Sequence, residues 1–457
     1  MQDFTNGSIP KHILRMSVPI FAGMIFQTLY YLVDLYFVAR LGDASVAGVS
    51  AAGNLQFFVM AVTQVLSVGT MVLIAHASGR KDRADASLVF HQSLLLAAVC
   101  MGLSLVIGYA LAGSYARTMA ANAATAEAAT AYLMAFIPAL ALQFALVTIG
   151  SALRGTGVAK PTMIVQLFSV LLNAVLAPIL IAGWGTGYPL GAAGAGLAST
   201  ISVFAAVVLM LWYFRKMETF VAFERSQLTV HFVTWKRILK IGLPAGGEFA
   251  LMFVYGAIIY LIIRDQGAAA QAGFGIGSRV MQALFIPAMA IAFAASPIAG
   301  QNIGAGNLAR ARETFLVGVG METVCMLLLT VLAQWKGAAL VGIFTQESAV
   351  VTVATTFLGI ISLNFAAQGV IFTASGMFQA IGNTVPAMIS SATRVVTFAV
   401  PAWWMSKRPE FELRHLWYLS MATVALQAVV SVSLLHREWR KRAGVVASGA
   451  TPVVASA

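Results

Sequence analysis

Long apolar segments, each followed by a short polar break, are the feature that most constrains this chain. Twelve of them follow one another, at residues 13–38, 46–74, 88–113, 129–152, 162–183, 190–214, 238–262, 269–298, 314–334, 350–377, 385–404 and 416–435. A helix needs about 20 residues to cross the hydrocarbon core of a bilayer, so each segment is long enough. Because 60% of the 457 residues are apolar and 10% are charged, a soluble enzyme or nucleic-acid binder of this length is excluded. We predict an all-α polytopic membrane protein with twelve transmembrane helices.

The basic residues are distributed unequally between the two sides of the membrane. If the amino terminus is cytoplasmic, 19 of the 28 Lys and Arg residues fall in cytoplasmic segments and 7 in external ones. Basic residues gather on the cytoplasmic side of membrane proteins, so we expect both termini in the cytoplasm. This distribution accounts for the net charge of +12, and we infer no nucleic-acid partner from it.

A polar linker divides the chain into two halves of six spans each. The linker lies within Arg215–Lys240, which is the longest polar stretch of the sequence. The tail Gly444–Ala457 is a low-complexity run that we expect to be disordered. The resulting domains are a cytoplasmic N-terminal segment, an N-lobe, a cytoplasmic linker, a C-lobe and a cytoplasmic tail, at residues 1–12, 13–217, 218–237, 238–436 and 437–457.

The two halves repeat one another at a constant offset of 225 residues. The matching positions are Pro19 with Pro244, Gly42 with Gly267, Ala47-Gly48 with Ala272-Gly273, Gly79 with Gly304, Thr148 with Thr373, Gly157 with Gly382, and Pro161 with Pro386. A six-helix unit begins and ends on the same side, so its duplicate inserts in the same orientation, and the two bundles are pseudo-symmetric. This architecture is typical of alternating-access transporters, in which a site between two bundles faces each side in turn.

Several motifs resemble those of one transporter family. They are Ser17-Val18-Pro19, Val33-Asp34, the loop Gly300–Asn307, and the paired turns Leu153–Pro161 and Phe378–Pro386. Over nearly its whole length the chain resembles the multidrug and toxic compound extrusion (MATE) transporters. The resemblance implies two six-helix lobes that form a V-shaped central cavity. It also implies secondary active export of amphiphilic or cationic organic compounds from a bacterium across its cytoplasmic membrane, driven by H⁺ or Na⁺.

One carboxyl group stands alone among the spans of the first half. Ionisable residues inside spans cost several kcal/mol unless they are paired or hydrated, and Asp34 is the one such group well inside the spans of its half, since Arg15 lies at a span end. Gln27 and Tyr30 precede it by seven and four residues, so the three side chains share one helix face. Removal from water favours the protonated carboxyl, which can then exchange a proton. A permanently protonated carboxyl that bonds two helices together is the alternative.

The resemblance assigns further residues to cation coupling. Asp34 falls on the family's first-helix acid, and Asn173 and Pro178 match a fifth-helix pattern in which an acid precedes the proline. Here that acid is replaced by Ala177, which leaves Asn173 and Ser199 as neutral oxygen donors. A metal cation needs several oxygen ligands, whereas a proton needs fewer partners. The sequence therefore favours H⁺ over Na⁺.

The second half carries Glu248, Arg279, Glu322 and Arg394 inside its spans, two acids and two bases that could pair and leave that lobe neutral. The resemblance places a seventh-helix acid of the sodium-coupled branch of MATE transporters at the position of Met252. Glu248 lies one helical turn before that position. Glu248 is either a substrate-facing carboxylate or the partner of Arg279. Gln368 replaces a tenth-helix acid of the same branch. We take Glu248, Gln368, Met252 and Ser199 as substrate-cavity candidates and favour a structural pair or packing role for Glu322.

Other classes of protein fit the pattern less well. A major facilitator-type exporter also has six plus six spans, but the chain lacks part of its loop motif, and a lipid-precursor flippase would have about fourteen spans and a cationic cavity. A channel would place matching polar rings in several helices. The spans carry no pattern typical of a hydrolase or a metal site, so we expect no catalytic residue, metal or cofactor. The expected partners are small organic substrates and membrane lipid, and we expect a monomer.

Overall fold

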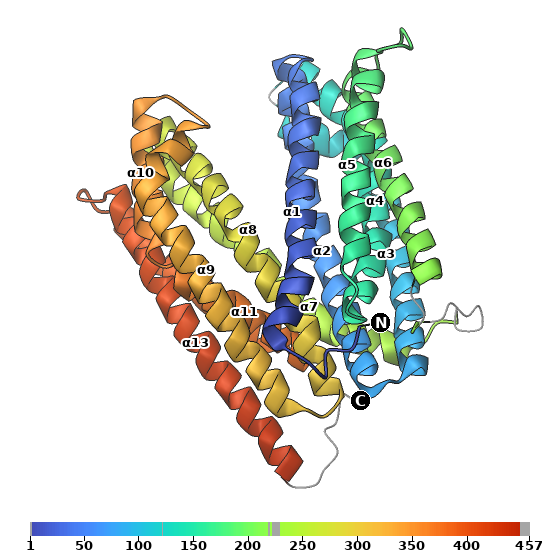
Figure 1. Cartoon of the computed structure of the whole chain (residues 1–457). Helices are drawn as coiled ribbons and strands as arrows, with labels where there is room; N and C mark the ends of the chain where they lie inside the picture. Colours follow the sequence, from blue (N-terminus) through green and yellow to red (C-terminus); the bar gives the residue numbers. More distant parts are fainter. Residues whose placement is uncertain (1, 121, 218–219, 222–228, 448–457) are drawn as a thin grey trace. The chain divides into compact units, whose positions relative to one another are not determined.

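The computed structural model describes residues 2–120, 122–217, 220–221 and 229–447, and this part of the chain consists of helices joined by short loops, with no β-strand (Figure 1). The α-helices are α1 (Ile9–Ala39), α2 (Asp43–Arg80), α3 (Arg83–Met119), α4 (Ala123–Gly155), α5 (Lys160–Ala182), α6 (Gly191–Met217), α7 (Phe232–Ile263), α8 (Ala268–Gly304), α9 (Leu308–Gly342), α10 (Ser348–Ser362), α11 (Phe365–Ile381), α12 (Val385–Ser406) and α13 (Leu413–Ala447). In the described ranges, 11 helices are long and apolar enough to cross a membrane, and α10 with α11 makes a twelfth if the pair is one span. The predicted all-α membrane fold is confirmed.

The tenth span differs from the continuous helix that the sequence predicts. α10 and α11 meet at an angle of 62° around Leu363 and Asn364. Side chains supply the hydrogen bonds that the break removes: Thr330 donates to the Ser362 carbonyl (2.8 Å) and Gln334 to the Gly359 carbonyl (2.6 Å). Asn364 donates to the carbonyl of Met421, 2.6 Å away. In lipid a backbone group must be satisfied by the protein itself, and these partners make the break stable.

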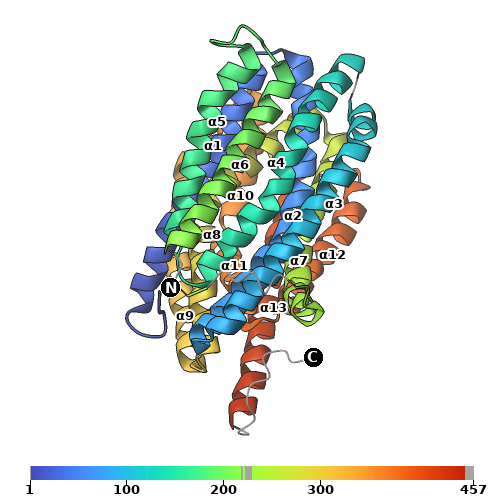
Figure 2. The same cartoon turned by 90° about the vertical axis from the view of Figure 1, so that its right-hand side faces the viewer.

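The described chain separates into two compact units. Unit 1 is Met1–Asp3 with Val18–Gly242, and unit 2 is Phe4–Ser17 with Leu243–Ala457. In unit 1 the central helix is α4, which packs against α2, α3 and α6 (Figure 2). Its buried stripe Leu133, Phe136, Ile137 and Leu140 forms the α4 part of the apolar core there.

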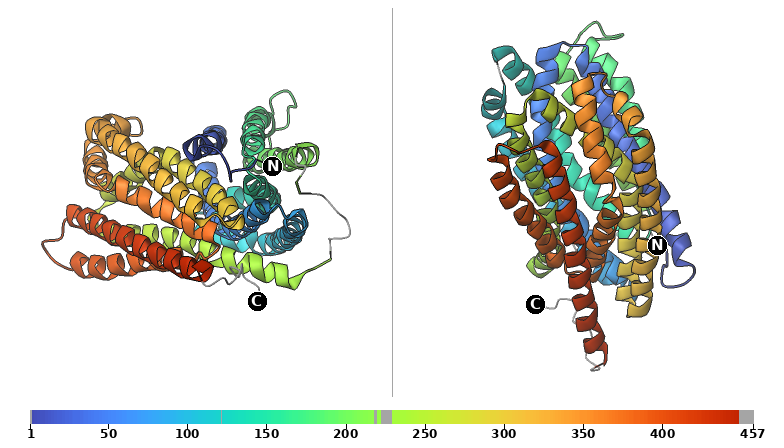
Figure 3. Two further views of the ribbon diagram at one scale, coloured as in Figure 1. Left: turned by 60° about the horizontal axis from the view of Figure 1, so that its bottom comes forward. Right: turned by 90° about the vertical axis from the view of Figure 1, so that its left-hand side faces the viewer.

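Unit 2 has an aromatic core of its own. Phe274 on α8 stacks on Trp417 of α13 with ring centroids 5.6 Å apart, and Phe357 of α10 meets the same indole edge-on at 4.9 Å. These large rings bury much apolar surface, which fixes α8, α10 and α13 together. Figure 3 shows α13, in red, running past the other helices of this unit.

Two helices are divided between the units. The first turns of α1 belong to unit 2, where the Phe4 amide donates to Gln301 Oε1 (3.1 Å) and Arg310 donates to the Gly7 carbonyl (2.7 Å). The first turns of α7 belong to unit 1, where Arg237 bonds to Asp85 at 2.9 Å. A proline, Pro19 or Pro244, closely follows each point of division.

Two predicted loop segments are partly helical. Residues 232–237 of the predicted linker form the start of α7, and 218–219 and 222–228 of it lie outside the described residues. The tail that was expected to be disordered from Gly444 continues α13 to Ala447, and 448–457 lie outside the described residues. Alanine and basic residues favour helix strongly enough to carry α13 past one glycine.

A close approach of α7 to α2 provides a test of this packing. A Cβ on Gly242 would overlap the Val65 carbonyl, whereas one on Gly256, also in α7, meets nothing within 4 Å. We expect Gly242→Ala to destabilise the protein by about 1–3 kcal/mol through overpacking. Gly256→Ala, the matched control, should instead stabilise it by about 0.5–1 kcal/mol. Thermal unfolding in detergent measures both, and equal melting temperatures would contradict the packing.

Candidate functional site

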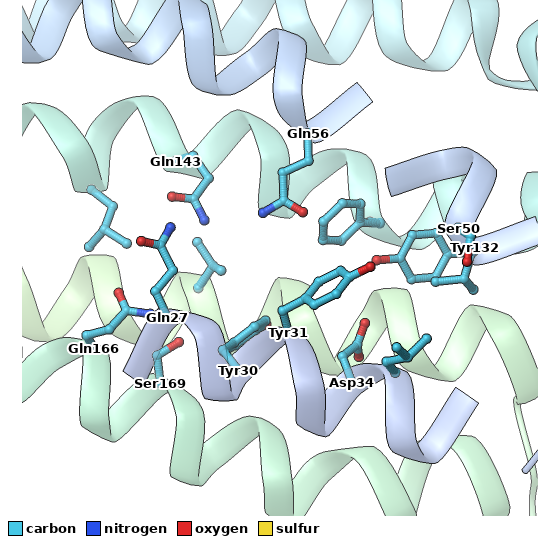
Figure 4. Close-up of a pocket in the computed structure, with 15 residues that line it drawn as sticks. Gln27, Tyr30, Tyr31, Asp34, Ser50, Gln56, Tyr132, Gln143, Gln166 and Ser169 are labelled. Atoms are coloured by element: carbon cyan, nitrogen blue, oxygen red, sulfur yellow. The ribbon is translucent and has the colours of Figure 1, made fainter. Parts of the chain in front are cut away.

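A polar cavity lies inside unit 1, at the helix face that carries Asp34. It holds about 810 Å³ of space, part of it open to solvent, and side chains of α1, α2, α4, α5 and α6 line it. Its polar lining, labelled in Figure 4, is Gln27, Tyr30, Tyr31, Asp34, Ser50, Gln56, Tyr132, Gln143, Gln166 and Ser169. A concave site with convergent polar groups is the usual form of a small-molecule site.

Helical spacing brings these groups to the cavity. On α1 the residues Gln27, Tyr30, Tyr31 and Asp34 recur three, four and seven positions apart, so one face presents all four. α5 presents a second stripe of Gln166, Ser169 and Asn173 with the same spacing. The α1 stripe lines the cavity with all four residues and the α5 stripe lines it with Gln166 and Ser169, while Asn173 lies outside the lining.

Asp34 is buried and incompletely bonded. Its side chain is 7% exposed, and within the described part of the chain its Oδ1 atom has no hydrogen-bond partner. An unpaired buried oxygen carries the full cost of its lost hydration. A proton or a bound cation would remove that cost, which makes this carboxyl a candidate binding group.

Asn173 connects Asp34's helix to α6. Its amide nitrogen donates to the Tyr30 hydroxyl (3.2 Å) and lies 3.5 Å from Ser199 Oγ, while no described residue donates to its Oδ1. Ser199 is 0% exposed. The structure therefore joins Ser199 to the Tyr30–Asn173 pair, behind the cavity surface, rather than to the other three substrate-cavity candidates.

Most of the cavity lining was not predicted from the sequence. The missed polar residues are Tyr31, Ser50, Gln56, Tyr132, Gln143, Gln166 and Ser169. The glutamines Gln56, Gln143 and Gln166 could have indicated the cavity, since an amide inside an apolar span needs a hydrogen-bond partner or a hydrated surface. Figure 4 also shows Tyr31 and Tyr132 with their hydroxyls directed toward one another.

The remaining substrate-cavity candidates lie in unit 2. Glu248 accepts a hydrogen bond from Ser375 Oγ at 2.8 Å, and Gln368 Oε1 accepts one from Arg394 at 3.4 Å. Arg394 also lies over the Tyr255 ring, 4.2 Å from its centroid. Met252 is 50% exposed. None of the candidates Glu248, Gln368 and Met252 lines the cavity of unit 1.

Of the two alternatives that the sequence leaves open for the embedded charges, the described part of the chain does not show the ion pairs. Among the described residues no ion pair joins Glu248 or Glu322 to Arg279 or Arg394. Hydroxyl groups hold the acids instead, Ser375 for Glu248 and Thr373 for Glu322. Arg279 is exposed and Arg394 lies over an aromatic ring, so neither base reaches an acid. Glu248 thus has Ser375 rather than Arg279 as its partner.

The polar site of unit 1 has an apolar counterpart in unit 2. At the 225-residue offset, Asp34 corresponds to Ile259 and Asn173 to Phe398, both in the core of unit 2. Tyr30 corresponds to Tyr255, which contacts the Phe398 ring at 4.7 Å where Tyr30 bonds to Asn173. The repeat geometry is kept while its polarity is not, so the site is built into one unit alone.

Comparison with protein families supports the internal repeat. The MatE family model matches residues 19–179 and again residues 244–404. Both ends of the second range are displaced by 225 residues from those of the first, which is the offset that the sequence predicts. The described residues contain no cluster of three or more His, Cys, Asp or Glu that could hold a metal ion.

Relatives and solved structures cover the chain almost completely. The Multidrug export protein MepA of Staphylococcus saprophyticus is 25% identical over 381 residues, 83% of each chain. The Probable multidrug resistance protein YoeA of Bacillus subtilis is 24% identical over 441 residues, 95% of each. A crystal structure of MATE in the bent conformation has the same fold, with a TM-score of 0.91 at 22% identity over 97% of this chain and 98% of that one. An outward-facing multidrug resistance MATE family transporter matches with a TM-score of 0.89 at 23% identity over 96% and 97%.

The Tyr30–Asn173 hydrogen bond can be measured by a double-mutant cycle. We expect Tyr30→Phe and Asn173→Ala to be coupled by about 0.5–1.5 kcal/mol in unfolding free energy, because each removes one partner of the same bond. Denaturation of the detergent-solubilised protein gives the four values. Tyr31→Phe, one residue along α1, serves as the control and should show no coupling to Asn173→Ala. Additive effects of the first pair would contradict the assignment.

Proposed function

Because the chain belongs to the MatE family, the multidrug and toxic compound extrusion transporters, we propose that it exports amphiphilic or cationic organic compounds as a secondary active antiporter. The family is one of multi-pass membrane transporters, not of enzymes, and this membership excludes the major facilitator-type alternative. Relatives that carry the names of multidrug export and resistance proteins support the drug substrates. We infer a monomer in a bacterial cytoplasmic membrane, with both termini cytoplasmic.

The observation that carries the proposal is the buried, incompletely bonded carboxyl of Asp34 at the polar cavity. In our proposal H⁺, rather than Na⁺, binds there. Ala177 supports the proton, since it is packed into the apolar core at the position of the missing acid and supplies no oxygen ligand. Gln27, Tyr30 and Asn173 complete the coupling group by orienting the α1 and α5 faces around Asp34.

Alternating access then couples the proton to export. An outward-facing state admits a proton to Asp34, and the neutral carboxyl changes the packing of α1 in unit 1 and releases the substrate. Deprotonation toward the cytoplasm resets the cycle. A substrate shifts such an equilibrium only by its differential affinity for the two states, so proton and drug binding must oppose one another.

The cavity lining fits cationic and amphiphilic compounds. The faces of Tyr31 and Tyr132 attract cations, and the glutamine amides both donate and accept hydrogen bonds. In unit 2 we keep Glu248, Gln368 and Met252 as substrate contacts in a later step of transport. Ser199 supports Asn173 instead.

Ethidium accumulation tests the proposal. We expect efflux-deficient bacteria that express the chain to accumulate less ethidium, and Asp34→Asn to abolish the difference because an amide cannot exchange a proton. Collapse of the proton gradient at constant sodium should have the same effect. Asp265→Asn removes an exposed carboxylate and should leave export unchanged.

The possible results separate the alternatives. Equal export by Asp34→Asn and the unmodified chain would refute coupling through this carboxyl. Export that survives loss of the proton gradient but requires sodium would reassign the ion. If membrane-inserted protein changes nothing, the proposed drug export is wrong for ethidium, and a dedicated metabolite or lipid-precursor exporter takes its place.

A further inference from the structure

Glu322 is a second buried carboxyl, and the proposed cycle does not use it. It lies on α9 in unit 2 and is 0% exposed. Thr373 on α11 donates to its Oε2 atom, while no described residue donates to Oε1. The group therefore has one hydroxyl partner, from a neighbouring helix, and one unpaired oxygen.

The internal repeat indicates that packing does not require this acid. At the same position of unit 1 stands Ala97, also buried, and Thr148 corresponds to Thr373. Phe144, buried in unit 1, corresponds to Gly369, where a Cβ would lie 3.1 Å from Glu322 Cγ. Unit 1 thus has a small residue, Ala97, where unit 2 has Glu322, and a large one, Phe144, where unit 2 has Gly369. The space for a carboxyl is built into unit 2.

Among the described residues, no basic group forms an ion pair with Glu322. Helices α8, α10 and α11 pack against α9. Helices α10 and α11 carry no titratable side chain, and the one titratable side chain of α8 is Arg279, which is exposed. On α9 itself Cys325 lies one turn away, half-buried. An ionised carboxylate in these surroundings is costly, and a proton is the simplest ligand that neutralises it.

Helix α11 can make the occupancy of this site change. It begins at the 62° break after α10, so its start is not held by a continuous helix. Besides Thr373 it carries Ser375, which donates to Glu248 of α7 at 2.8 Å. Two carboxyls from two helices thus depend on hydroxyls of one helix, and a displacement of α11 changes the hydrogen bonds of both.

We propose that Glu322 is a second proton-binding group, which takes up and releases its proton as α11 moves against α9 within unit 2. Its place in a transport cycle rests on the proposed function, but its titration does not. The alternative is a carboxyl that stays protonated permanently and only packs.

Infrared difference spectroscopy of the purified full chain tests the titration without any substrate. We expect a protonated-carboxyl band that vanishes reversibly as pH rises, and that Glu322→Gln removes. Glu313→Gln, which removes an exposed carboxylate of the same helix, should leave the band unchanged. A Glu322 band that persists at every pH at which the protein stays folded, or that is absent at every pH, would overturn the proposal.

Two further variants separate titration from folding defects. Thr373→Val keeps the shape of the side chain but removes the donor, so the pH range over which the band vanishes should shift. An unshifted range would contradict the role of α11, and this variant decides the matter if Glu322→Gln does not fold.

Transport then tests the place of the site in the cycle. Glu322→Gln retains an oxygen that accepts from Thr373, so a packing residue would tolerate the change. We expect ethidium export by this variant to lose part of its dependence on external pH, while Glu313→Gln keeps all of it. Full pH dependence in Glu322→Gln would place the site outside the cycle. If the unmodified chain exports no ethidium, the proposed function fails while the infrared titration still decides the proton site.

Discussion

The constraint on which this structure depends is that polar groups within the spans must find their partners inside the protein. At the break between α10 and α11, Thr330 and Gln334 donate to carbonyls at the end of α10, and Asn364 joins the break to α13 through the Met421 carbonyl. Asn173 meets Tyr30 and Ser199 for the same reason. Not every buried oxygen among the described residues has a partner: unpaired carboxylate oxygens remain on Asp34 and Glu322, and unpaired amide or hydroxyl oxygens remain on Asn173 and several other residues. An unpaired carboxylate oxygen is the most costly of these to bury, so a proton or a ligand gains most at Asp34 and Glu322.

The two copies of the six-helix repeat carry polar residues at different positions. Unit 1 places Asp34 and Asn173 where unit 2 has Ile259 and Phe398. Unit 2 places Glu248 and Glu322 where unit 1 has Gly23 and Ala97. In both units the Tyr30 and Tyr255 positions keep their ring and their neighbour, one through a hydrogen bond and one through an aromatic contact. The shared backbone therefore determines which positions meet, and the side chains determine whether they meet as a core or as a site.

The spans were predictable from the local composition of the apolar segments, and the repeat was predictable from the constant spacing of matching residues. The break at Leu363 was not predictable, because the residue that usually interrupts a helix, proline, lies in the other half. At the 225-residue offset Leu363 corresponds to Pro138, which lies inside the continuous helix α4. The partners of α10 come from α9, and no pattern within the tenth segment reveals them. The stripe of Gln27, Tyr30 and Asp34 was predictable from helical period alone, whereas Tyr132 and Gln143 join it only through packing of α4. Whether the embedded acids and bases pair could not be decided from the sequence, because their count says nothing of which helix faces they occupy.

The two divided helices show how movement of a unit can reach the candidate site. α1 begins in unit 2, and Asp34 lies on its later part, in unit 1. α7 is divided in the opposite sense, with Glu248 after its point of division. Any displacement of one unit must be absorbed where these helices pass between them, and Pro19 and Pro244 lie there. A proline removes a backbone hydrogen bond and lets a helix bend at that point. In the proposed cycle, bending of α1 at Pro19 would change how the stripe of Gln27, Tyr30 and Asp34 meets α5, and with it the Tyr30–Asn173 bond. The coupling is reciprocal, so a proton that altered the packing around Asp34 would also alter the bend that is compatible with it.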